Sequence, residues 1–179
     1  MTSPRPHRVA GIVLAAGAGT RFGGPVKQLH LLDGRPMLEH VLATMAEAGL
    51  DEVIVVLGAN AGAVLEGVDL HGARPVVSER WADGQAASLQ DALAATDAGA
   101  ALIVLGDGPR LSADAVRRIA AADGPAAADY GSGRSHPVLL PRTVWRSLPA
   151  AGETPGREVQ VRLVDCGDLP PPGDVDYPD

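Results

Sequence analysis

The chain has 179 residues, a length that predicts one domain over residues 1–179 with one sizeable hydrophobic core. Hydrophobic residues make up 46% of it, which excludes an intrinsically disordered protein, while an aromatic content of 3% leaves the core to Ala, Val, Leu and Ile. The formal net charge of −7 argues against broad binding to nucleic acid or to an anionic membrane.

The first half of the chain alternates apolar runs with helical spacing. Residues 9–15 form a continuous apolar run, as a buried parallel strand does, and the glycine-rich loop after it argues against a signal peptide. Apolar residues recur at helical spacing over residues 37–45, and Gly49 follows where a helix C-cap is expected. Residues 53–57 and 73–77 are the next predicted strands.

The second half continues the alternation. Residues 88–95 are a predicted helix, residues 101–105 are the most apolar strand, and Ser112 caps a helix that runs to about residue 121. Strands are predicted at 138–140 and at 159–164, the latter with the alternation of a half-exposed strand.

This order of elements predicts an α/β fold, a three-layer α/β/α domain with a mostly parallel central sheet. Proline and glycine cluster at 123–137 and at 168–178, but neither cluster separates two segments large enough to form cores. The acidic, proline-rich tail from Asp168 to Asp179 is expected to be irregular.

The single cysteine and the lack of a long apolar run favour a protein of the reducing cytoplasm. Cys166 is the single cysteine, so no internal disulfide can form. No apolar run approaches the roughly 20 residues that a membrane span needs. We expect a cytoplasmic monomer or weak homodimer that binds neither nucleic acid nor membrane.

The loop over residues 14–27 carries the strongest chemical signal. It follows a buried strand, and open α/β sheets bind ligands beyond the carboxyl ends of their strands. Its small residues allow backbone N–H groups to approach phosphate oxygens, and Arg21 and Lys27 add positive charge. The loop therefore predicts a site for the phosphates of a nucleoside triphosphate.

Two commoner glycine loops do not fit these residues. A P-loop requires Ser or Thr after its lysine, and Gln28 follows Lys27. A dinucleotide fingerprint requires G-x-G-x-x-G, whereas Gly17, Gly19 and Gly23 follow G-x-G-x-x-x-G. A structural turn with incidental charges is the plain alternative.

The same residues resemble the MobA-like nucleotidyltransferase family, whose signature is L-A-[AG]-G-x-[GS]-x-R-[MF]-G followed by Lys. The chain reads Leu-Ala-Ala-Gly-Ala-Gly-Thr-Arg-Phe-Gly at 14–23, then Lys27. The resemblance covers nearly the whole chain and implies a Rossmann-like nucleotide-diphospho-sugar transferase architecture. The Ala-Ala-Gly version is similar to the cytidylyl-transferring branch, typified by molybdenum cofactor cytidylyltransferase, whereas the spacing from Gly23 to Lys27 is closer to the guanylyl branch.

Two further segments resemble family motifs. Residues 81–89 resemble W-x-x-G-x-x-x-S-[LV], in which the glycine and serine lie near the base and ribose. Residues 106–109 resemble G-D-x-P, whose Asp binds Mg²⁺. The alternative is that Asp107 forms an Asx-turn before Pro109, a common structural role that needs no metal. The resemblance implies nucleotide contacts at Leu14, Ala15, Ala16, Gly17, Gly19, Thr20, Arg21, Lys27, Gly58, Gly84 and Ser88.

The acceptor side matches the family less well. Residues 133–138 resemble a G-H-P-V segment, which makes His136 the predicted acceptor contact. Residues 174–179 resemble an acidic family ending that implies Asp176 as a second Mg²⁺ ligand beside Asp107. Departures from the family pattern at 108–110 and 153–157 fall near the acceptor or the metal, so they leave the second substrate open.

The resulting prediction is a Mg²⁺-dependent nucleotidyltransferase. It would transfer CMP from CTP to a phosphorylated small molecule such as molybdopterin cofactor and release pyrophosphate, with Arg21, Lys27 and Asp107 as catalytic residues. Three alternatives stay open: another phosphorylated acceptor, a nicotinamide-dependent oxidoreductase such as the pigment-reducing relatives near this family, and a non-catalytic nucleotide-binding module.

Overall fold

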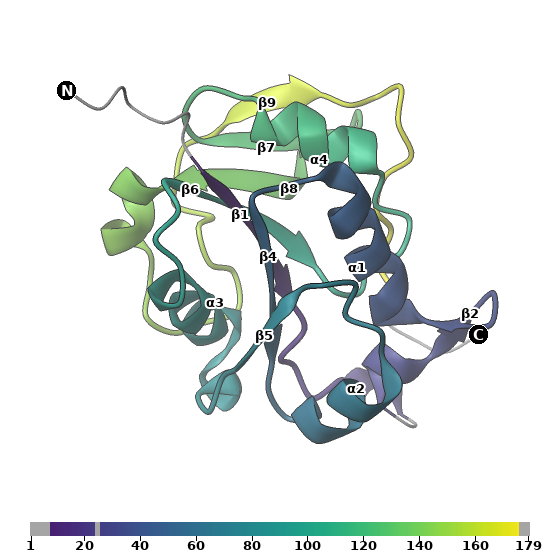
Figure 1. The fold of residues 1–179 in the computed structure, drawn as a ribbon. Helices are drawn as coiled ribbons and strands as arrows, with labels where there is room; N and C mark the ends of the chain where they lie inside the picture. The colour runs from purple at the N-terminus through teal and green to yellow at the C-terminus, as the bar shows by residue number, and fades with distance from the viewer. Residues whose placement is uncertain (1–7, 24–25, 176–179) are drawn as a thin grey trace.

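The computed structural model describes residues 8–23 and 26–175, which are built on a seven-stranded sheet (Figure 1). Its strands are β1 (Val9–Leu14), β4 (Glu52–Leu57), β5 (Arg74–Val77), β6 (Ala100–Leu105), β7 (Ala126–Asp129), β8 (Arg134–Pro141) and β9 (Arg162–Asp165). Their order is β5-β4-β1-β6-β8-β7-β9, and within the described residues only β8 runs antiparallel to its neighbours. The predicted mostly parallel sheet is therefore confirmed.

Helices cover both faces of the sheet and form the outer two layers. One face packs against α1 (Met37–Ala48), α2 (Ala61–Gly67) and α4 (Ala113–Ala120), and the other packs against α3 (Gln85–Ala94) and the 3₁₀ helix η4 (Arg142–Ser147) (Figure 1). The smaller elements are the 3₁₀ helices η1 (Thr20–Phe22), η2 (Lys27–Leu29) and η3 (Trp81–Asp83) and the short hairpin of β2 (Leu31–Leu32) and β3 (Arg35–Pro36).

The central strand β1 explains why its sequence is apolar without interruption. Ile12 packs into the core on the α3 side, and Val13 packs into the core beneath α1. Both side chains are fully buried, which stabilises the fold by roughly 1.5–3 kcal/mol for each such residue. The helix stop was also predicted correctly, because Gly49 has a left-handed backbone at the end of α1.

Helix α2 and strand β7 were not predicted from the sequence. Helix α2 has one buried side chain, Val64, so its sequence shows no helical periodicity. Strand β7 and the start of β8 lie within residues 123–137, where proline and glycine cluster and no strand was predicted before residue 138. Residues 126–128 are alanines with little β-propensity, and they form a strand because β8 and β9 pair with both sides of it.

Two predicted boundaries were wrong. The last strand begins at Arg162 rather than at residue 159, and Leu163 is 48% exposed because β9 lies at the sheet edge and pairs only with β7. Helix α3 begins at Gln85, three residues before Ser88, because Gly84 takes the N-cap position. Residues 168–175 contain no helix or strand, as predicted for the described part of the tail.

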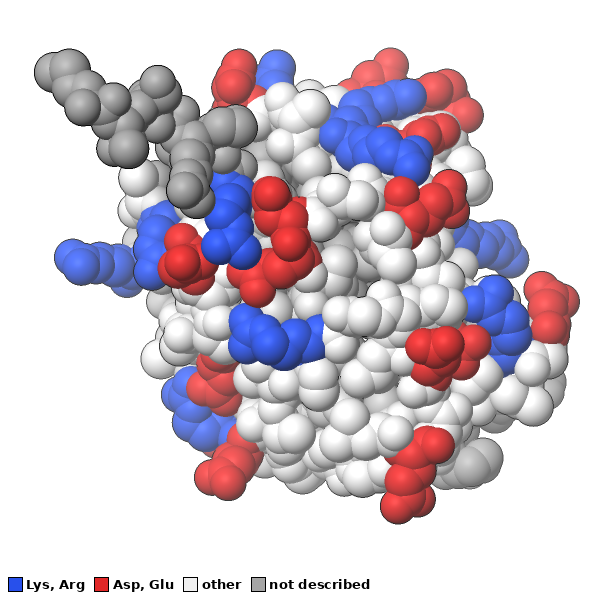
Figure 2. Space-filling model, viewed as in Figure 1, with Lys and Arg blue, Asp and Glu red and all other residues white. Residues whose placement is uncertain are grey.

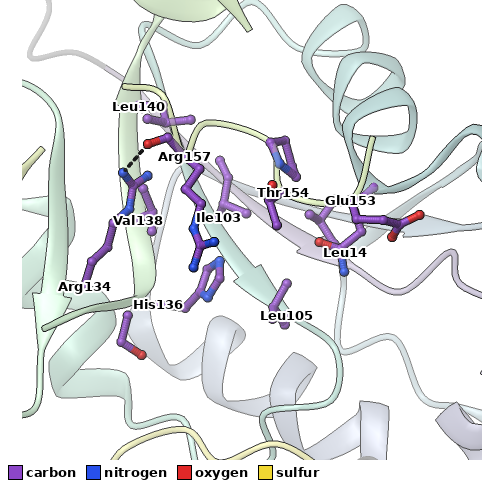
Figure 3. Close-up of a pocket in the computed structure, with 13 residues that line it drawn as sticks. Leu14, Ile103, Leu105, Arg134, His136, Val138, Leu140, Glu153, Thr154 and Arg157 are labelled. Carbon is purple, nitrogen blue, oxygen red and sulfur yellow. Dashed lines mark hydrogen bonds between the residues drawn. The ribbon is translucent and has the colours of Figure 1, made fainter. Parts of the chain in front are cut away.

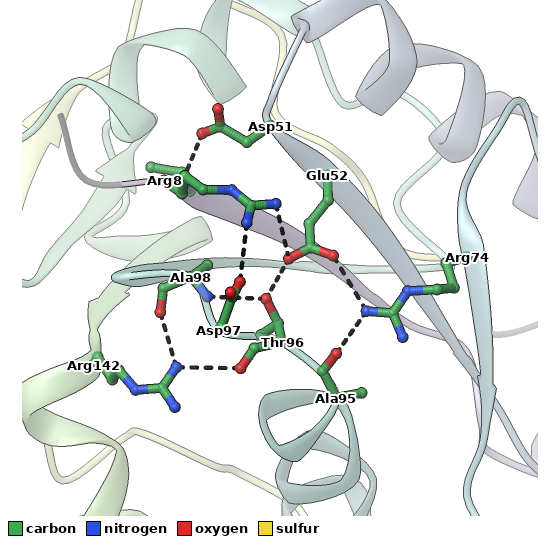
Figure 4. A network of polar contacts seen from close by, with 10 residues as sticks. Arg8, Asp51, Glu52, Arg74, Ala95, Thr96, Asp97, Ala98 and Arg142 are labelled. Atoms are coloured by element: carbon green, nitrogen blue, oxygen red, sulfur yellow. Dashed lines mark hydrogen bonds and ion pairs between the residues drawn. The ribbon is translucent and has the colours of Figure 1, made fainter. Parts of the chain in front are cut away.

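Hydrogen bonds and ion pairs link several side chains at the amino-terminal edge of the sheet (Figure 4). The carboxylate of Glu52 accepts hydrogen bonds from the Thr96 hydroxyl and, at 3.2 Å, from Arg74. Arg8 lies 3.0 Å from Asp97 in an ion pair. The charged groups at this edge are therefore paired with one another.

Charged side chains of both signs are interspersed over the face seen in Figure 2, and the described residues there form no continuous basic field. A single-sign field is what broad nucleic-acid binding uses. Among residues 8–23 and 26–175, no helix combines the length and apolar character needed to cross a membrane.

Candidate functional site

The candidate site lies at the carboxyl edge of the parallel strands. Leu14 ends β1, Leu105 ends β6, and the two residues are partners in the ladder. The loops that follow them, 15–27 and 106–110, therefore begin side by side. This edge is where open α/β sheets bind ligands.

The first loop is anchored through its carbonyl groups. The Gln28 amide donates to the carbonyls of Ala15 at 2.8 Å and Gly17 at 3.2 Å. The N–H of Ala59, in the turn after β4, donates to the carbonyl of Ala16 at 3.3 Å. The loop is thereby fixed from two directions.

The N–H groups of the same loop remain available to a ligand. Those of residues 16–20 donate to no described residue. Gly19 has a left-handed backbone with φ of 64°, and a Cβ there would lie 3.0 Å from the Cβ of Lys27. Glycine therefore allows the lysine stem to pack against a row of unused donors, an arrangement suited to an anion.

An ion pair joins the two loops. Lys27 Nζ lies 3.0 Å from Asp107 Oδ2, and the two side chains are 15% and 28% exposed. The other carboxylate oxygen, Oδ1, is buried and has no hydrogen-bond partner among the described residues. A buried oxygen without a donor is the kind of atom that a bound cation would satisfy.

Three adjoining cavities lie at this edge of the sheet. The loop cavity, about 310 Å³, lies between the first loop and the start of α3, and the ion-pair cavity, about 120 Å³, surrounds Lys27 and Asp107. The β8 cavity, about 370 Å³, lies beside β8. Leu14 and Gln85 line all three, so the cavities are parts of one cleft.

The β8 cavity has an apolar wall and charged residues of both signs, Arg134, Arg157 and Glu153 (Figure 3). Ile103, Val138 and Leu140 form part of the wall. Arg157 extends toward the imidazole of His136, and its guanidinium forms no hydrogen bond or ion pair with a described residue. Arg134 instead donates to the carbonyl of Gly156 at 2.7 Å and thereby holds the segment that carries Arg157.

His136 lies where β8 is irregular. The pairing of β7 with β8 shifts between Ala127 and Ala128, so His136 and Pro137 have no partner on β7. Burial is the main reason that the pKa of His136 falls to about 4; Arg134 lowers it further, and Asp107 opposes the shift. The imidazole is therefore neutral near pH 7.

Most of the residues predicted to bind nucleotide line the cleft. The loop cavity and the ion-pair cavity are lined by Leu14, Ala15, Ala16, Gly17, Gly19, Thr20, Lys27, Gly84, Ser88 and Asp107. His136 lines the β8 cavity. The roles assigned to these residues stay predictions.

Two predicted residues, Arg21 and Gly58, do not line these cavities, and a third, Asp176, is not described. Arg21 is exposed and is not among the residues that line these cavities, because its neighbour Phe22 takes the buried position in η1. Gly58 lies behind the loop, where a Cβ would come within 2.5 Å of the Ala16 carbonyl oxygen. Asp176 lies outside the described residues, so its role as a metal ligand stays a prediction.

Sequence reasoning missed two glutamines of the cleft. Gln85 lines all three cavities, and Gln28 anchors the first loop while its own side chain is buried. Gln85 follows Gly84 directly and begins a helix that faces the site. This position could have identified Gln85 as a candidate from the sequence. Gln28 carried no such signal, because its partners are backbone carbonyls.

A family model for the MobA-like NTP transferase domain matches residues 11–165, most of the chain. The chain belongs to the MobA-like NTP transferase family. The match includes both strands of the cleft and the loops that follow them. The nucleotidyltransferase fold and family predicted from the sequence are thereby confirmed.

Relatives within and around the MobA-like family carry different names. The chain is 34% identical to nicotine blue oxidoreductase of Paenarthrobacter nicotinovorans, over 94% of this chain and 92% of that protein. It is 35% identical to the bifunctional protein GlmU of an Exiguobacterium species over 62% of this chain, but that match spans only 25% of GlmU.

Solved structures agree with the family. Rv0371c from Mycobacterium tuberculosis H37Rv is 33% identical, with a TM-score of 0.79 over 96% of this chain and 94% of that one. A structure of Rv0371c in complex with manganese is also known. Mth528, a nucleotidyl transferase from Methanothermobacter thermautotroptrophicus, is 26% identical, with a TM-score of 0.81 over 95% of this chain and 92% of that one.

Proposed function

We propose that this protein transfers a nucleoside monophosphate, with CTP as the favoured donor, to a phosphorylated small molecule such as molybdopterin cofactor. The observation that carries the proposal is the ion pair of Lys27 and Asp107, whose cavity shares Leu14 and Gln85 with both the loop cavity and the β8 cavity. Two substrates bound in these cavities would meet beside a cation and a carboxylate.

The donor nucleotide fits the loop side of the cleft. Its phosphates would lie against the unused N–H groups of residues 16–20 and the ammonium group of Lys27. Its base and ribose would occupy the loop cavity, beside Gly84 and Ser88. Arg21 stays a proposed phosphate contact from the solvent side.

The residues at the ion pair fit a divalent cation. Asp107 Oδ1 is buried without a hydrogen-bond partner in the described part of the chain, and carboxylate oxygen is the ligand that Mg²⁺ prefers. We assign Asp107 as one ligand and Asp176 as a second. When bound, Mg²⁺ would neutralise phosphate charge during the transfer. The manganese complex of Rv0371c supports a divalent ion in this family.

The acceptor fits the β8 cavity. Its apolar wall suits an organic ring system, and Arg157 and neutral His136 can contact a phosphate. An oxygen of that phosphate would form a bond to the α-phosphorus, and the bond from the α-phosphorus to the bridging oxygen of pyrophosphate would break. The protein contributes by positioning both substrates and by placing Lys27 near the developing charge.

One relative favours a second candidate function. The resemblance to nicotine blue oxidoreductase covers nearly the whole chain, so reduction of a pigment with a nicotinamide cofactor is the alternative. The two functions differ in the first ligand that each needs, a nucleoside triphosphate or NADPH.

A binding comparison followed by a turnover assay tests the proposal. Melting temperatures would be measured with Mg²⁺ and each nucleoside triphosphate, and separately with NADPH. We expect stabilisation by CTP above the others, and pyrophosphate release from CTP once a molybdopterin acceptor is added. Stabilisation by NADPH alone would overturn the proposal. CTP binding without pyrophosphate release would indicate a non-catalytic nucleotide-binding module instead of an enzyme.

A further inference from the structure

One wall of the loop cavity comes from a segment about 70 positions downstream of the helix that it contacts. The N–H of Ala86 donates to the carbonyl of Gly152 at 2.8 Å, and the N–H of Gly152 donates to the carbonyl of Asp83 at 2.9 Å. The carbonyl of Gly152 is thus bonded to the start of α3, and its N–H is bonded to the end of η3. These bonds fix the position of the next residue, Glu153.

Glu153 lies directly over Gly84. Gly84 has φ of 99°, and a Cβ there would lie 2.5 Å from the Gly152 carbonyl oxygen and 3.0 Å from Glu153 Oε1. Only glycine leaves room for this approach. The carboxylate therefore reaches the part of the cleft in which we place the base and ribose.

Glu153 is the one charged side chain among the described residues that line the loop cavity, and it also lines the adjoining β8 cavity, where Arg134 and Arg157 lie. The rest of the lining is small or neutral: Leu14, Ala16, Gly17, Ala18, Thr20, Trp81, Ala82, Gly84, Gln85 and Ser88. No hydrogen bond or ion pair joins the Glu153 carboxylate to a described residue. Glu153 is exposed, so water solvates its carboxylate while the cleft is empty. An ionised carboxylate only accepts hydrogen bonds, so a ligand that displaces this water must offer a donor in its place.

The charge of Glu153 also orients the nucleotide. A carboxylate repels a triphosphate, whereas the ammonium group of Lys27, which lines the ion-pair cavity, attracts it. Because the triphosphate is drawn toward Lys27, the nucleoside end of the ligand is the end near Glu153. The plain alternative, a solvated surface carboxylate, predicts no effect of Glu153 on the choice of base.

We infer that Glu153 accepts a hydrogen bond from the exocyclic amino group of the donor base and thereby selects CTP over UTP. The inference rests on the proposed function, since it concerns the donor site of that reaction. Cytosine presents an amino group at the position where uracil presents a carbonyl oxygen. The two rings have the same size, so a carboxylate at this place distinguishes them by hydrogen-bond polarity alone.

The test is a titration of the full chain with Mg²⁺–CTP and with Mg²⁺–UTP by calorimetry. We expect the wild type to bind CTP at least about tenfold more tightly than UTP, the ratio that one charged hydrogen bond provides. Glu153→Gln should lower this ratio at least about fivefold, because an amide can donate to the uracil oxygen as well as accept. Glu66→Gln, an exposed position on α2, should leave the ratio unchanged.

The outcomes separate this inference from the proposed function. Equal binding of CTP and UTP by the wild type, or the same ratio in the wild type and Glu153→Gln, overturns the inference alone. Binding of purine nucleotides only also overturns it, while nucleotidyl transfer stands. Failure of every nucleoside triphosphate to bind overturns the proposed function itself. Melting temperatures without nucleotide verify that both variants are folded.

Discussion

Lys27 and Asp107 are 80 positions apart in the chain, and their charged groups lie 3.0 Å from each other at the carboxyl edge of the sheet. They meet because β1 and β6 are parallel neighbours and each residue lies in the loop after its strand. Lys27 contacts one oxygen of Asp107, and the other oxygen is left without a partner among the described residues. The pair is therefore a functional arrangement in our proposal and only secondarily a stabilising one.

Replacement of Asp107 by asparagine should separate activity from stability. We expect pyrophosphate release to fall about 100-fold or more, because the metal ligand is lost at a site where charge develops. The free energy of unfolding should fall by at most about 1 kcal/mol, since the ion pair is partly exposed. Asp123→Asn, at an exposed position, is the matched control. Retention of activity by Asp107→Asn would show that the metal assignment is wrong.

Replacement of Gln28 by alanine should loosen the first loop. The change removes the donor to the carbonyls of Ala15 and Gly17 and leaves these groups unsatisfied. The expected loss is about 1–3 kcal/mol in the free energy of unfolding, measured with a chemical denaturant, together with weaker nucleotide binding. Gln160→Ala, at an exposed position, should change neither quantity. Equal behaviour of the two variants would contradict the anchoring role.

His136 should make the protein less stable in acid. Its pKa is about 4 in the folded protein against 6.5 for the free side chain, so the unfolded chain binds more protons between these values. Stability therefore falls as the pH drops from about 6.5 to 4, by up to about 1.4 kcal/mol per pH unit.

The variant His136→Gln isolates this effect. Denaturant unfolding at pH 7.5, 6 and 4.5 should show that the wild type loses more stability than the variant, with a difference of about 1–3 kcal/mol at pH 4.5. Between pH 7 and 8 the two proteins should change in parallel, which is the internal control. Parallel behaviour over the whole range would mean that the imidazole is not desolvated.

Replacement of Glu52 by glutamine should affect stability without affecting function. Glu52 contacts Thr96 and Arg74 at the amino-terminal edge of the sheet, away from the cleft (Figure 4). We expect a loss of about 1–2 kcal/mol in the free energy of unfolding, because a partly buried charged network loses one member. The affinity for CTP, measured by calorimetry, should stay that of the wild type. A change in affinity would reveal coupling between the two edges.

The order of strands and helices could be predicted from local patterns. A strand buried on both faces needs apolar residues on both faces, and residues 9–15 satisfy this requirement by themselves. Gly49 and Ser112 act through their own backbone and side-chain chemistry, so the ends that they form were predicted correctly. By contrast, Ala126–Asp129 became a strand only because its neighbours supply hydrogen-bond partners on both sides.

The sequence by itself determined the α/β class, the family and the choice of residues 14–27 as the proposed phosphate loop, because those depend on residue types at fixed short spacings. Only the tertiary structure decided which distant groups share the cleft. It joined Lys27 to Asp107, buried Gln28 beneath the loop, and bonded Gly152 to the start of α3 so that Glu153 faces Gly84. The physical reason is that these contacts depend on strand order and on backbone hydrogen bonds between segments, which no local pattern of side chains encodes.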